Sequence, residues 1–278
     1  MGRSLVRGAL RRAAKTAAGV ADRVRPPGRG VVVLAYHRVG GGSHLEIDLP
    51  TTAFDAQMGQ LARSGRAVAL DEALALLAGP PPRDEDRADP VVVTFDDGTA
   101  DFVEHALPVL VRHRVPATVY VATEHVECQR PFPHDGPPLT WTALAEAVAT
   151  GLVTVGSHTH THALLDQLDE AGAARELDTS IDLIAEHLGV VPVHFAYPKA
   201  VAGSPGAVAA VRTRFTSAAL AGTRPNRYGA TDPHELARSP IQRSDGTRWF
   251  AAKVAGGLGL EDRARQMLDR RRYAGVTT

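Results

Sequence analysis

The sequence predicts an α/β fold in which buried parallel strands alternate with helices. Residues 31–36 and 91–95 are unbroken apolar runs, which is typical of strands buried on both faces of a parallel sheet. Segments with helical spacing separate the strand-like runs, as in βαβ units that close into a barrel or form an open doubly wound sheet. In either arrangement the functional side chains are expected at the carboxyl ends of the strands.

Strand-like and helix-like segments alternate along the chain, and each is read from its spacing of apolar residues. The expected strands are residues 31–36, 67–70, 91–95, 117–121, 152–155, 193–197 and 215–218. The expected helices are residues 54–64, 71–77, 100–113, 140–150, 170–188, 206–213 and about 263–272. Thr140 is the expected N-cap of the helix at residues 140–150, and Gly189 is expected to end the helix at residues 170–188. Residues 79–90 are expected to form a surface loop, and residues 221–246 are polar and expected to be irregular.

The length allows one large α/β domain or two small ones, and the composition favours a folded protein. A barrel of about 250 residues fits within the 278 residues of the chain. Apolar residues make up 44% and charged residues 22%, which argues against disorder over most of the chain. The formal net charge is zero, so no nucleic-acid partner is expected. The single cysteine, Cys128, allows no intrachain disulfide. No apolar run approaches the roughly 20 residues of a membrane span, no secretory signal is expected, and the expected location is cytoplasmic.

Residues 1–29 form an expected basic amphipathic arm, ahead of a main domain at residues 30–278. The charged residues of its first 25 positions are Arg3, Arg7, Arg11, Arg12, Lys15, Asp22, Arg23 and Arg25. Residues 3–23 have helical spacing with a thin, alanine-rich apolar face. The arm is either a helix that contacts a membrane surface or a partner, or a solvated helix packed loosely on the domain. The second interpretation is favoured because no Trp or Phe anchors the apolar face.

Polar side chains follow four of the expected strands. These groups are Tyr36-His37-Arg38, Asp96-Asp97-Gly98, His158-Thr159-His160-Thr161-His162 and Tyr197-Pro198-Lys199. Because the carboxyl ends of parallel strands meet at one edge, these separate groups are expected to converge at one rim.

The paired aspartates and the run of histidines together indicate a divalent metal site. Two imidazoles and one carboxylate form an open site with room for water, as in hydrolytic zinc enzymes. His158 and His162 are the expected ligands, with His160 as the alternative. One aspartate would bind the metal while the other accepts a proton from water, although Asp-Asp-Gly is also common turn chemistry.

Two segments resemble motifs of a known family. Residues 91–98 (VVVTFDDG) and 155–165 (VGSHTHTHALL) are similar to the first two motifs of the polysaccharide deacetylase family, also called NodB-homology or carbohydrate esterase family 4. Those motifs read T-F-D-D-G and H-[S/T]-x-x-H and occur in the same order. The similarity extends over about residues 30–245 and includes Tyr36-His37-Arg38-Val39, Leu139-Thr140-Trp141 and Phe195-Ala196-Tyr197-Pro198. F-A-Y-P is typical of a branch that acts on poly-N-acetylglucosamine.

The resemblance implies a distorted (β/α) barrel of about seven parallel strands, forming a single domain with an N-terminal helical arm. It implies a metal-dependent hydrolase that removes the N-acetyl group from an N-acetylated sugar or polysaccharide. Asp96 would be the general base, and Asp97, His158 and His162 would hold one divalent ion. Zinc is the expected ion, and the donor set also accepts cobalt, manganese or iron. The backbone N–H of Lys199 would stabilise the oxyanion.

The chain departs from the family pattern at several positions. Ala196 stands where the family has an arginine that orients the catalytic aspartate, and Lys199 replaces an aromatic residue. No late Leu-x-His supplies a general acid, so His37 is a candidate, weighed equally against a structural role. Tyr197 and Pro198 are expected to contact substrate. Arg238 lies in a segment similar to the same branch, but the sequence assigns it no role.

Two other functions stay open from the sequence. One is a hydrolase acting on another C–N bond, such as a formamide on a lipid-linked sugar. The other is a catalytically weakened relative that binds carbohydrate without turnover; Ala196 and the missing late histidine favour it, whereas the retained Asp96 argues against it. The sequence does not predict the oligomeric state.

Overall fold

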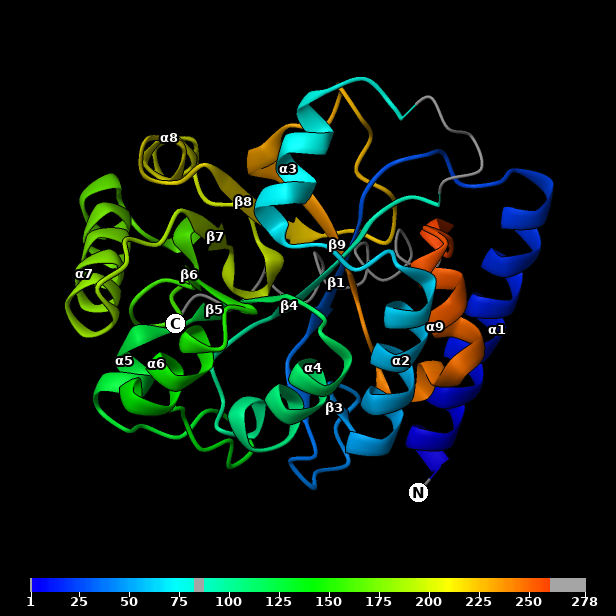
Figure 1. Cartoon of the computed structure of the whole chain (residues 1–278), viewed down its shortest axis with the longest axis horizontal. Helices are drawn as coiled ribbons and strands as arrows, with labels where there is room; N and C mark the ends of the chain where they lie inside the picture. The colour runs from blue at the N-terminus through cyan, green and yellow to red at the C-terminus, as the bar shows by residue number, and fades with distance from the viewer. Residues whose placement is uncertain (1, 83–87, 261–278) are drawn as a thin grey trace.

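The computed structural model describes residues 2–82 and 88–260. Seven parallel strands close into a barrel in the order β1-β4-β5-β6-β7-β8-β9, and β9 pairs with β1 to complete it (Figure 1). The barrel strands are β1 (Val32–Tyr36), β4 (Val91–Phe95), β5 (Ala117–Val121), β6 (Val153–Ser157), β7 (His194–Ala196), β8 (Ser217–Ala221) and β9 (Leu236–Pro240). The short strands β2 (Arg38–Val39) and β3 (Asp48–Leu49) pair outside the barrel.

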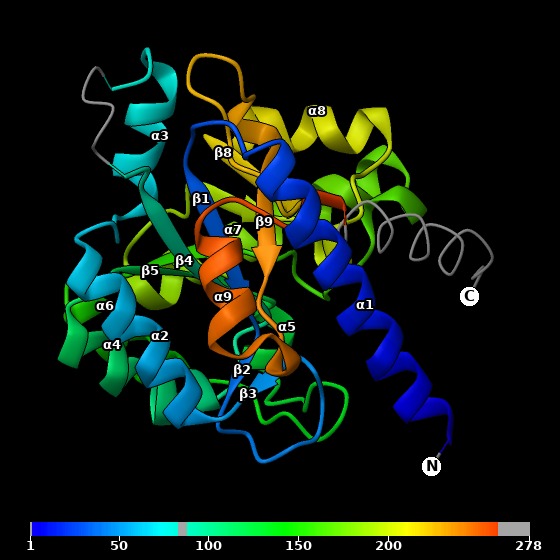
Figure 2. The ribbon, with the colours of Figure 1, turned by 90° about the vertical axis from the view of Figure 1, so that its right-hand side faces the viewer.

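Helices surround the barrel in both ribbon views (Figures 1 and 2). The α-helices are α1 (Gly2–Val24), α2 (Thr51–Ser64), α3 (Leu70–Ala78), α4 (Leu107–His113), α5 (Thr123–Glu127), α6 (Trp141–Ala149), α7 (Glu170–Leu188), α8 (Pro205–Arg214) and α9 (Gly246–Val254). The shorter helical segments are η1 (Phe102–Ala106), η2 (Leu165–Gln167), η3 (Pro198–Ala200), η4 (Pro233–Glu235) and η5 (Arg243–Asp245). The predicted distorted (β/α) barrel of about seven parallel strands is therefore confirmed, as is the N-terminal helix.

One expected strand is wrong and one strand was not expected. Residues 67–70 form no strand, because Ala67 makes only an isolated bridge to Val91 and Leu70 already begins α3. The seventh strand is instead β9, which lies within the segment expected to be irregular. Its polar residues Arg238 and Ser239 are each 2% exposed, because Arg238 pairs with Asp96 and the Ser239 hydroxyl donates to the Thr223 hydroxyl. The other expected strands all overlap barrel strands.

The expected helices between residues 54 and 213 all overlap helices of the structure, and their caps agree with the sequence. The Thr140 hydroxyl accepts a hydrogen bond from the Ala143 N–H at the start of α6, and Gly189 ends α7 in a left-handed conformation. The short α5 and the α9 helix were not expected. The helix expected at about 263–272 lies outside the described residues.

The strand register decides which side chains meet at the rim of the barrel. Tyr36 lies beside Phe95, so the residues that follow β1 and β4 leave the barrel at the same level. Ser157 lies beside Phe195, so His158 emerges next to the end of β7. The strands β1, β4 and β5 have five residues each, and every one of these residues is buried. Close packing on both faces therefore fixes the positions of the strand ends.

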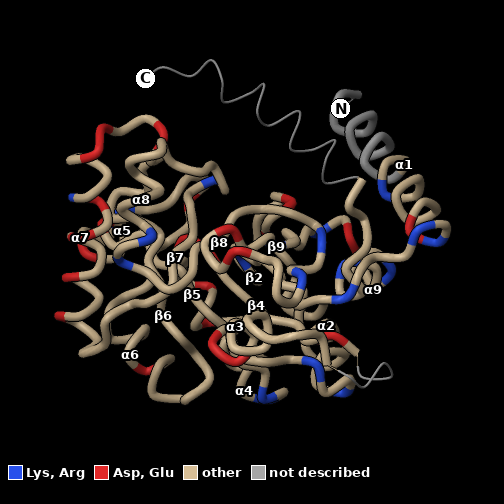
Figure 3. Tube along the Cα trace, turned by 90° about the horizontal axis from the view of Figure 1, so that it is seen from above, with Lys and Arg blue, Asp and Glu red and all other residues tan. Residues whose placement is uncertain are grey.

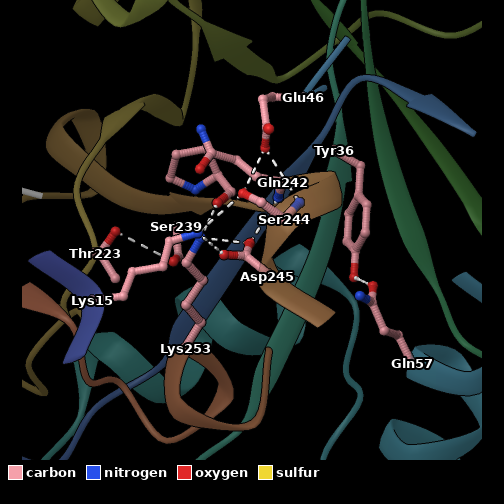
Figure 4. A network of polar contacts seen from close by, with 11 residues as sticks. Lys15, Tyr36, Glu46, Gln57, Thr223, Ser239, Gln242, Ser244, Asp245 and Lys253 are labelled. Carbon is pink, nitrogen blue, oxygen red and sulfur yellow. Dashed lines mark hydrogen bonds and ion pairs between the residues drawn. The ribbon is translucent and has the colours of Figure 1, made fainter. Parts of the chain in front are cut away.

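The N-terminal helix α1 packs against the barrel beside α9 (Figures 1 and 2). Its Lys15 is 1% exposed, and the Lys15 ammonium lies 2.6 Å from one Asp245 carboxylate oxygen. The Lys253 ammonium from α9 lies 2.7 Å from the other oxygen and also donates to the Pro240 carbonyl (Figure 4). This buried Lys15–Asp245–Lys253 network ties α1 to the end of β9 and the start of α9.

The opposite side of α1 is exposed, with Val20 at 53% and Val24 at 84%. Lys and Arg positions occur on α1 and α9, whereas Asp and Glu positions line the outer side of α7 (Figure 3). Within residues 2–82 and 88–260, no helix combines the length and the apolar character needed to cross a membrane. Contact of the arm with a membrane surface, and the division of the chain at residue 30, stay predictions.

Asp245→Asn should destabilise the protein strongly, because it removes the carboxylate that pairs with both buried ammonium groups of this network. We expect the free energy of unfolding in urea at pH 7 to fall by about 3–5 kcal/mol. Lys15→Met should cost less, because the Asp245–Lys253 pair remains and the methionine fills similar space. Equal losses in the two variants would contradict the central role of Asp245.

The contribution of Asp245 should disappear in acid. Burial favours the neutral carboxyl, but Lys253 and Lys15 outweigh it and lower the pKa of Asp245 below its ordinary value. The unfolded chain therefore takes up the proton first, near a pKa of about 3.9. The difference in unfolding free energy between wild type and Asp245→Asn should be constant between pH 7 and pH 5 and shrink below about pH 4. A difference at pH 3 as large as that at pH 7 would contradict this account.

Candidate active site

Two adjacent aspartates follow β4 and point to different partners. Asp97 has a φ of +74° and Gly98 a φ of +94°, so the chain turns sharply in the left-handed region directly after Asp96. A non-glycine residue in this region is strained, and such strain often occurs at functional sites. The turn sends the Asp96 carboxylate toward β9 and the Asp97 carboxylate toward the histidines that follow β6.

Asp97, His158 and His162 form a cluster that fits a metal ion. One Asp97 carboxylate oxygen lies 3.6 Å from Nε2 of His158 and 3.4 Å from Nε2 of His162. Candidate ligand atoms of the three residues all lie within 4.8 Å of one another. The His158 Nδ1 lies 2.7 Å from the Ala196 carbonyl, which can only accept, so Nδ1 carries the proton and Nε2 has the free lone pair. Two imidazole nitrogens and one carboxylate are the donors of open zinc sites.

The protonation states suit metal binding at neutral pH. Burial lowers the pKa of His158 to about 4, so its imidazole is neutral above that range. Burial favours the neutral form of the Asp97 carboxyl, but its hydrogen bond to His162 and the nearby histidines hold its pKa well below the ordinary value. Asp97 is therefore ionised, and His158 offers a lone pair.

Asp96 is held by an arginine from the last strand of the barrel. Arg238 on β9 donates from Nη1 to one Asp96 oxygen over 2.5 Å and from Nη2 to the other over 2.8 Å. Arg238 also donates to the Thr94 hydroxyl and lies over the ring of Tyr120, 5.2 Å from its centroid. Burial opposes ionisation of Asp96, but Arg238 and His158 outweigh it and lower the pKa of Asp96. The arginine absent at Ala196 is thus supplied from another strand.

Sequence reasoning missed Arg238 because its segment was expected to be irregular. The signal available was the similarity of the segment around it to one branch of the family, which by itself assigned no contact. Had the segment been predicted as a buried strand, Arg238 would have required an anionic partner, because a buried guanidinium is costly when it is unpaired.

His37, after β1, lies beside the aspartate pair. Its Nε2 is 3.9 Å from an Asp96 oxygen, and its side chain is 26% exposed. His37 is therefore close enough to exchange a proton with Asp96 through one water, while one side of its ring faces solvent.

His160 lies outside the cluster. Its Nδ1 is 3.0 Å from the Thr123 hydroxyl, and its backbone N–H donates to Glu176. The geometry therefore favours His162 over His160 as the second histidine of the candidate metal site.

The segment after β7 turns sharply where the strand ends. Lys199 and Ala200 both have positive φ, and Lys199 is exposed. Tyr197 is 2% exposed and packs edge-on against Phe195, and burial raises the pKa of Tyr197 to about 12. Pro198 is also buried. Little side-chain surface of Tyr197 and Pro198 is available, so their contact with substrate stays a prediction, as does the role of the Lys199 N–H.

Comparison with known proteins agrees with this geometry. The family model described as polysaccharide deacetylase matches residues 83–211, which contain Asp96, Asp97 and the histidine segment. No curated protein matches the chain. IcaB from Ammonifex degensii is 29% identical, with a TM-score of 0.68 over 83% of this chain and 98% of its own.

Two further structures are similar in fold. The Streptococcus pyogenes deacetylase PplD, solved with acetate, is 20% identical, with a TM-score of 0.68 over 82% of this chain and 99% of its own. The BpsB deacetylase domain from Bordetella bronchiseptica is 21% identical, with a TM-score of 0.59 over 78% of this chain and 97% of its own.

The closed parallel barrel and its rim of carboxylates and imidazoles define a (β/α)-barrel enzyme of the deacetylase type. Residues 83–211 match the polysaccharide deacetylase family model, which confirms the family resemblance seen in the motifs.

Arg238→Met should destabilise the fold, because it leaves the Asp96 carboxylate buried without its main positive partner. We expect the free energy of unfolding at pH 7 to fall by about 3–5 kcal/mol and the pKa of Asp96 to rise. The double variant Arg238→Met with Asp96→Asn should recover part of the loss, because no buried charge remains unpaired. Arg112→Met, which breaks an exposed pair with Asp55, is the control and should change stability little. A loss no larger than that of the control would contradict the importance of the buried pair.

Proposed function

We propose that this protein is a metal-dependent hydrolase that removes the N-acetyl group from an N-acetylated sugar or polysaccharide. One observation carries the proposal: the ionised Asp96 carboxylate lies at the same rim as the Asp97, His158 and His162 cluster. A second carboxylate beside such a cluster suits hydrolysis, in which a group near the metal must take a proton from water.

Asp97, His158 and His162 would hold one divalent ion. Such an ion, when bound, supplies Lewis acidity toward a carbonyl oxygen and toward water. Zinc suits two imidazoles and a carboxylate, and cobalt, manganese or iron suit the same donors.

Asp96 is the proposed general base. It accepts a proton from the water whose oxygen attacks the acetamide carbonyl carbon. Arg238 keeps Asp96 ionised and fixes the direction of its oxygens, so the carboxylate is ready to accept at neutral pH. The C–N bond then breaks, and acetate and a free amine leave.

The leaving amine requires a proton, and His37 is the proposed donor. His37 Nε2 lies 3.9 Å from an Asp96 oxygen, so the proton that Asp96 takes from water can pass to His37 and from there to the amine. The Lys199 backbone N–H is the proposed donor to the oxyanion, since it follows β7 at the same rim.

Two alternatives concern the substrate and the turnover. A hydrolase of another C–N bond, such as a formamide on a lipid-linked sugar, would use the same residues in the same roles. A carbohydrate-binding relative without turnover would gain nothing from an Asp96 carboxylate that is buried at the cost of desolvation and held by Arg238. The buried pair therefore favours an active hydrolase.

The test of the proposal is acetate release from N-acetylglucosamine oligosaccharides by zinc- or cobalt-loaded protein. Asp96→Asn should lower the rate by about 10²–10⁴-fold, because it removes the proton acceptor and leaves the metal ligands in place. His160→Ala is the matched control and should retain most of the activity, since His160 lies outside the cluster.

Measuring the metal bound to each variant separates the alternatives. His158→Ala should lose the bound ion, whereas Asp96→Asn should keep it. If wild type binds a metal ion but releases no acetate from any of these substrates, the deacetylase proposal is wrong and a binding protein or another acyl group is favoured.

A further inference from the structure

Helix α7 carries a carboxylate that contacts the histidine segment at three points. One Glu176 oxygen accepts hydrogen bonds from the backbone N–H groups of His160 and Thr161, over 2.9 and 2.8 Å. The other oxygen accepts from the Thr161 hydroxyl over 2.9 Å. Acidic positions line the outer side of α7 (Figure 3), but these three bonds direct the Glu176 carboxylate to the backbone between His158 and His162.

One turn further along α7, Ser180 contacts the start of the same segment. Its hydroxyl lies 2.8 Å from the hydroxyl of Ser157, the last residue of β6. The Ser157 hydroxyl also lies 3.3 Å from the Thr159 N–H, which donates to it. Both serines are fully buried. Residues four positions apart lie on one face of a helix, so a single face of α7 anchors the segment at two places.

The backbone of the histidine segment requires such anchoring. Thr159 and His162 have φ values of +65° and +62°, in the left-handed region that residues with a side chain rarely adopt. A residue in this conformation is strained and persists only where its surroundings fix it. His158 is fixed separately by the Ala196 carbonyl, so the position of His162 depends on how the residues between the two histidines are held.

An ionised carboxylate suits this position for a chemical reason. It has no hydrogen to donate and accepts several bonds, which matches two N–H groups and one hydroxyl. Hydrogen bonds to a charged acceptor are also stronger than those between neutral groups. None of the steps proposed for hydrolysis uses Glu176, so its contacts with the segment need another explanation.

We propose that Glu176, supported by Ser180, is a positioning residue that fixes the relative placement of His158 and His162 and thereby sets the affinity and geometry of the metal site. The inference rests on the proposed function, since it assigns a metal to Asp97, His158 and His162. It adds that α7, which supplies no ligand, determines how well the ligands converge.

The first experiment titrates purified full-length protein with Zn²⁺ and, separately, with Co²⁺. Glu176→Ala should weaken metal binding by about 10–100-fold, the usual effect of losing a group that orients ligands. The visible absorption of bound Co²⁺ should also change, because it reports the ligand geometry. Glu186→Ala, an exposed carboxylate on the same helix, is the matched control and should bind both ions as wild type does.

A conservative variant separates positioning from general stability. In Glu176→Gln, the side-chain carbonyl accepts from both N–H groups, and the amide donates to the Thr161 hydroxyl. All three contacts are retained without the charge, so metal affinity and the Co²⁺ spectrum should return most of the way to wild type. If Glu176→Ala does not fold, Ser180→Ala replaces it with the same expected direction, because it removes the second anchor.

The second experiment needs no metal. Amide hydrogen exchange of His160 and Thr161 in the metal-free protein should be faster in Glu176→Ala than in wild type and unchanged in Glu186→Ala. Unchanged exchange together with unchanged metal affinity would overturn the inference.

The outcomes for the inference and for the proposed function are distinct. If wild type binds metal, Asp97→Ala abolishes binding and Glu176→Ala binds as tightly as wild type, the positioning role is wrong and the metal site stands. If wild type itself binds neither ion, the proposed function fails, and so does a role of Glu176 in metal binding.

Discussion

The buried pair of Asp96 and Arg238 is the interaction on which the site depends. Asp96 follows β4 and Arg238 lies on β9, so the two meet only when β9 has paired with β1 and closed the barrel. An unpaired carboxylate in this interior would lose its charge or destabilise the fold. Closure of the barrel therefore supplies the partner that keeps the Asp96 carboxylate ionised once it is buried.

The backbone at the rim is as specialised as the side chains. Asp97, Thr159, His162 and Lys199 all adopt positive φ, and they lie directly after three different strands. The turns after β4 and β6 bring the side chains of Asp97, His158 and His162 together, and the neighbouring contacts hold the strained conformation in place. The groups are thus ordered before any substrate arrives, which reduces the entropy that binding must overcome.

The sequence predicted the strand ends because apolar runs such as residues 91–95 end abruptly in polar groups. It therefore located Asp96, Asp97, His158 and His162, which the structure brings to one rim. It did not predict β9, because Arg238 and Ser239 are buried by partners distant in sequence, and a polar strand has no apolar pattern. The contacts of Glu176 were missed for the same reason, since spacing along a helix does not reveal which loop packs on it.

The Lys15–Asp245–Lys253 network has a consequence for synthesis of the chain. Lys15 and Asp245 are 230 positions apart, so the first helix leaves the ribosome long before its anchor exists. Likewise, β1 cannot pair with β9 until β9, the last barrel strand in the sequence, has been synthesised. During translation the N-terminal segment must remain undocked while most of the barrel emerges. Docking of α1 is then among the final steps of folding, and a chain that stops before residue 236 leaves both the helix undocked and the barrel seam open.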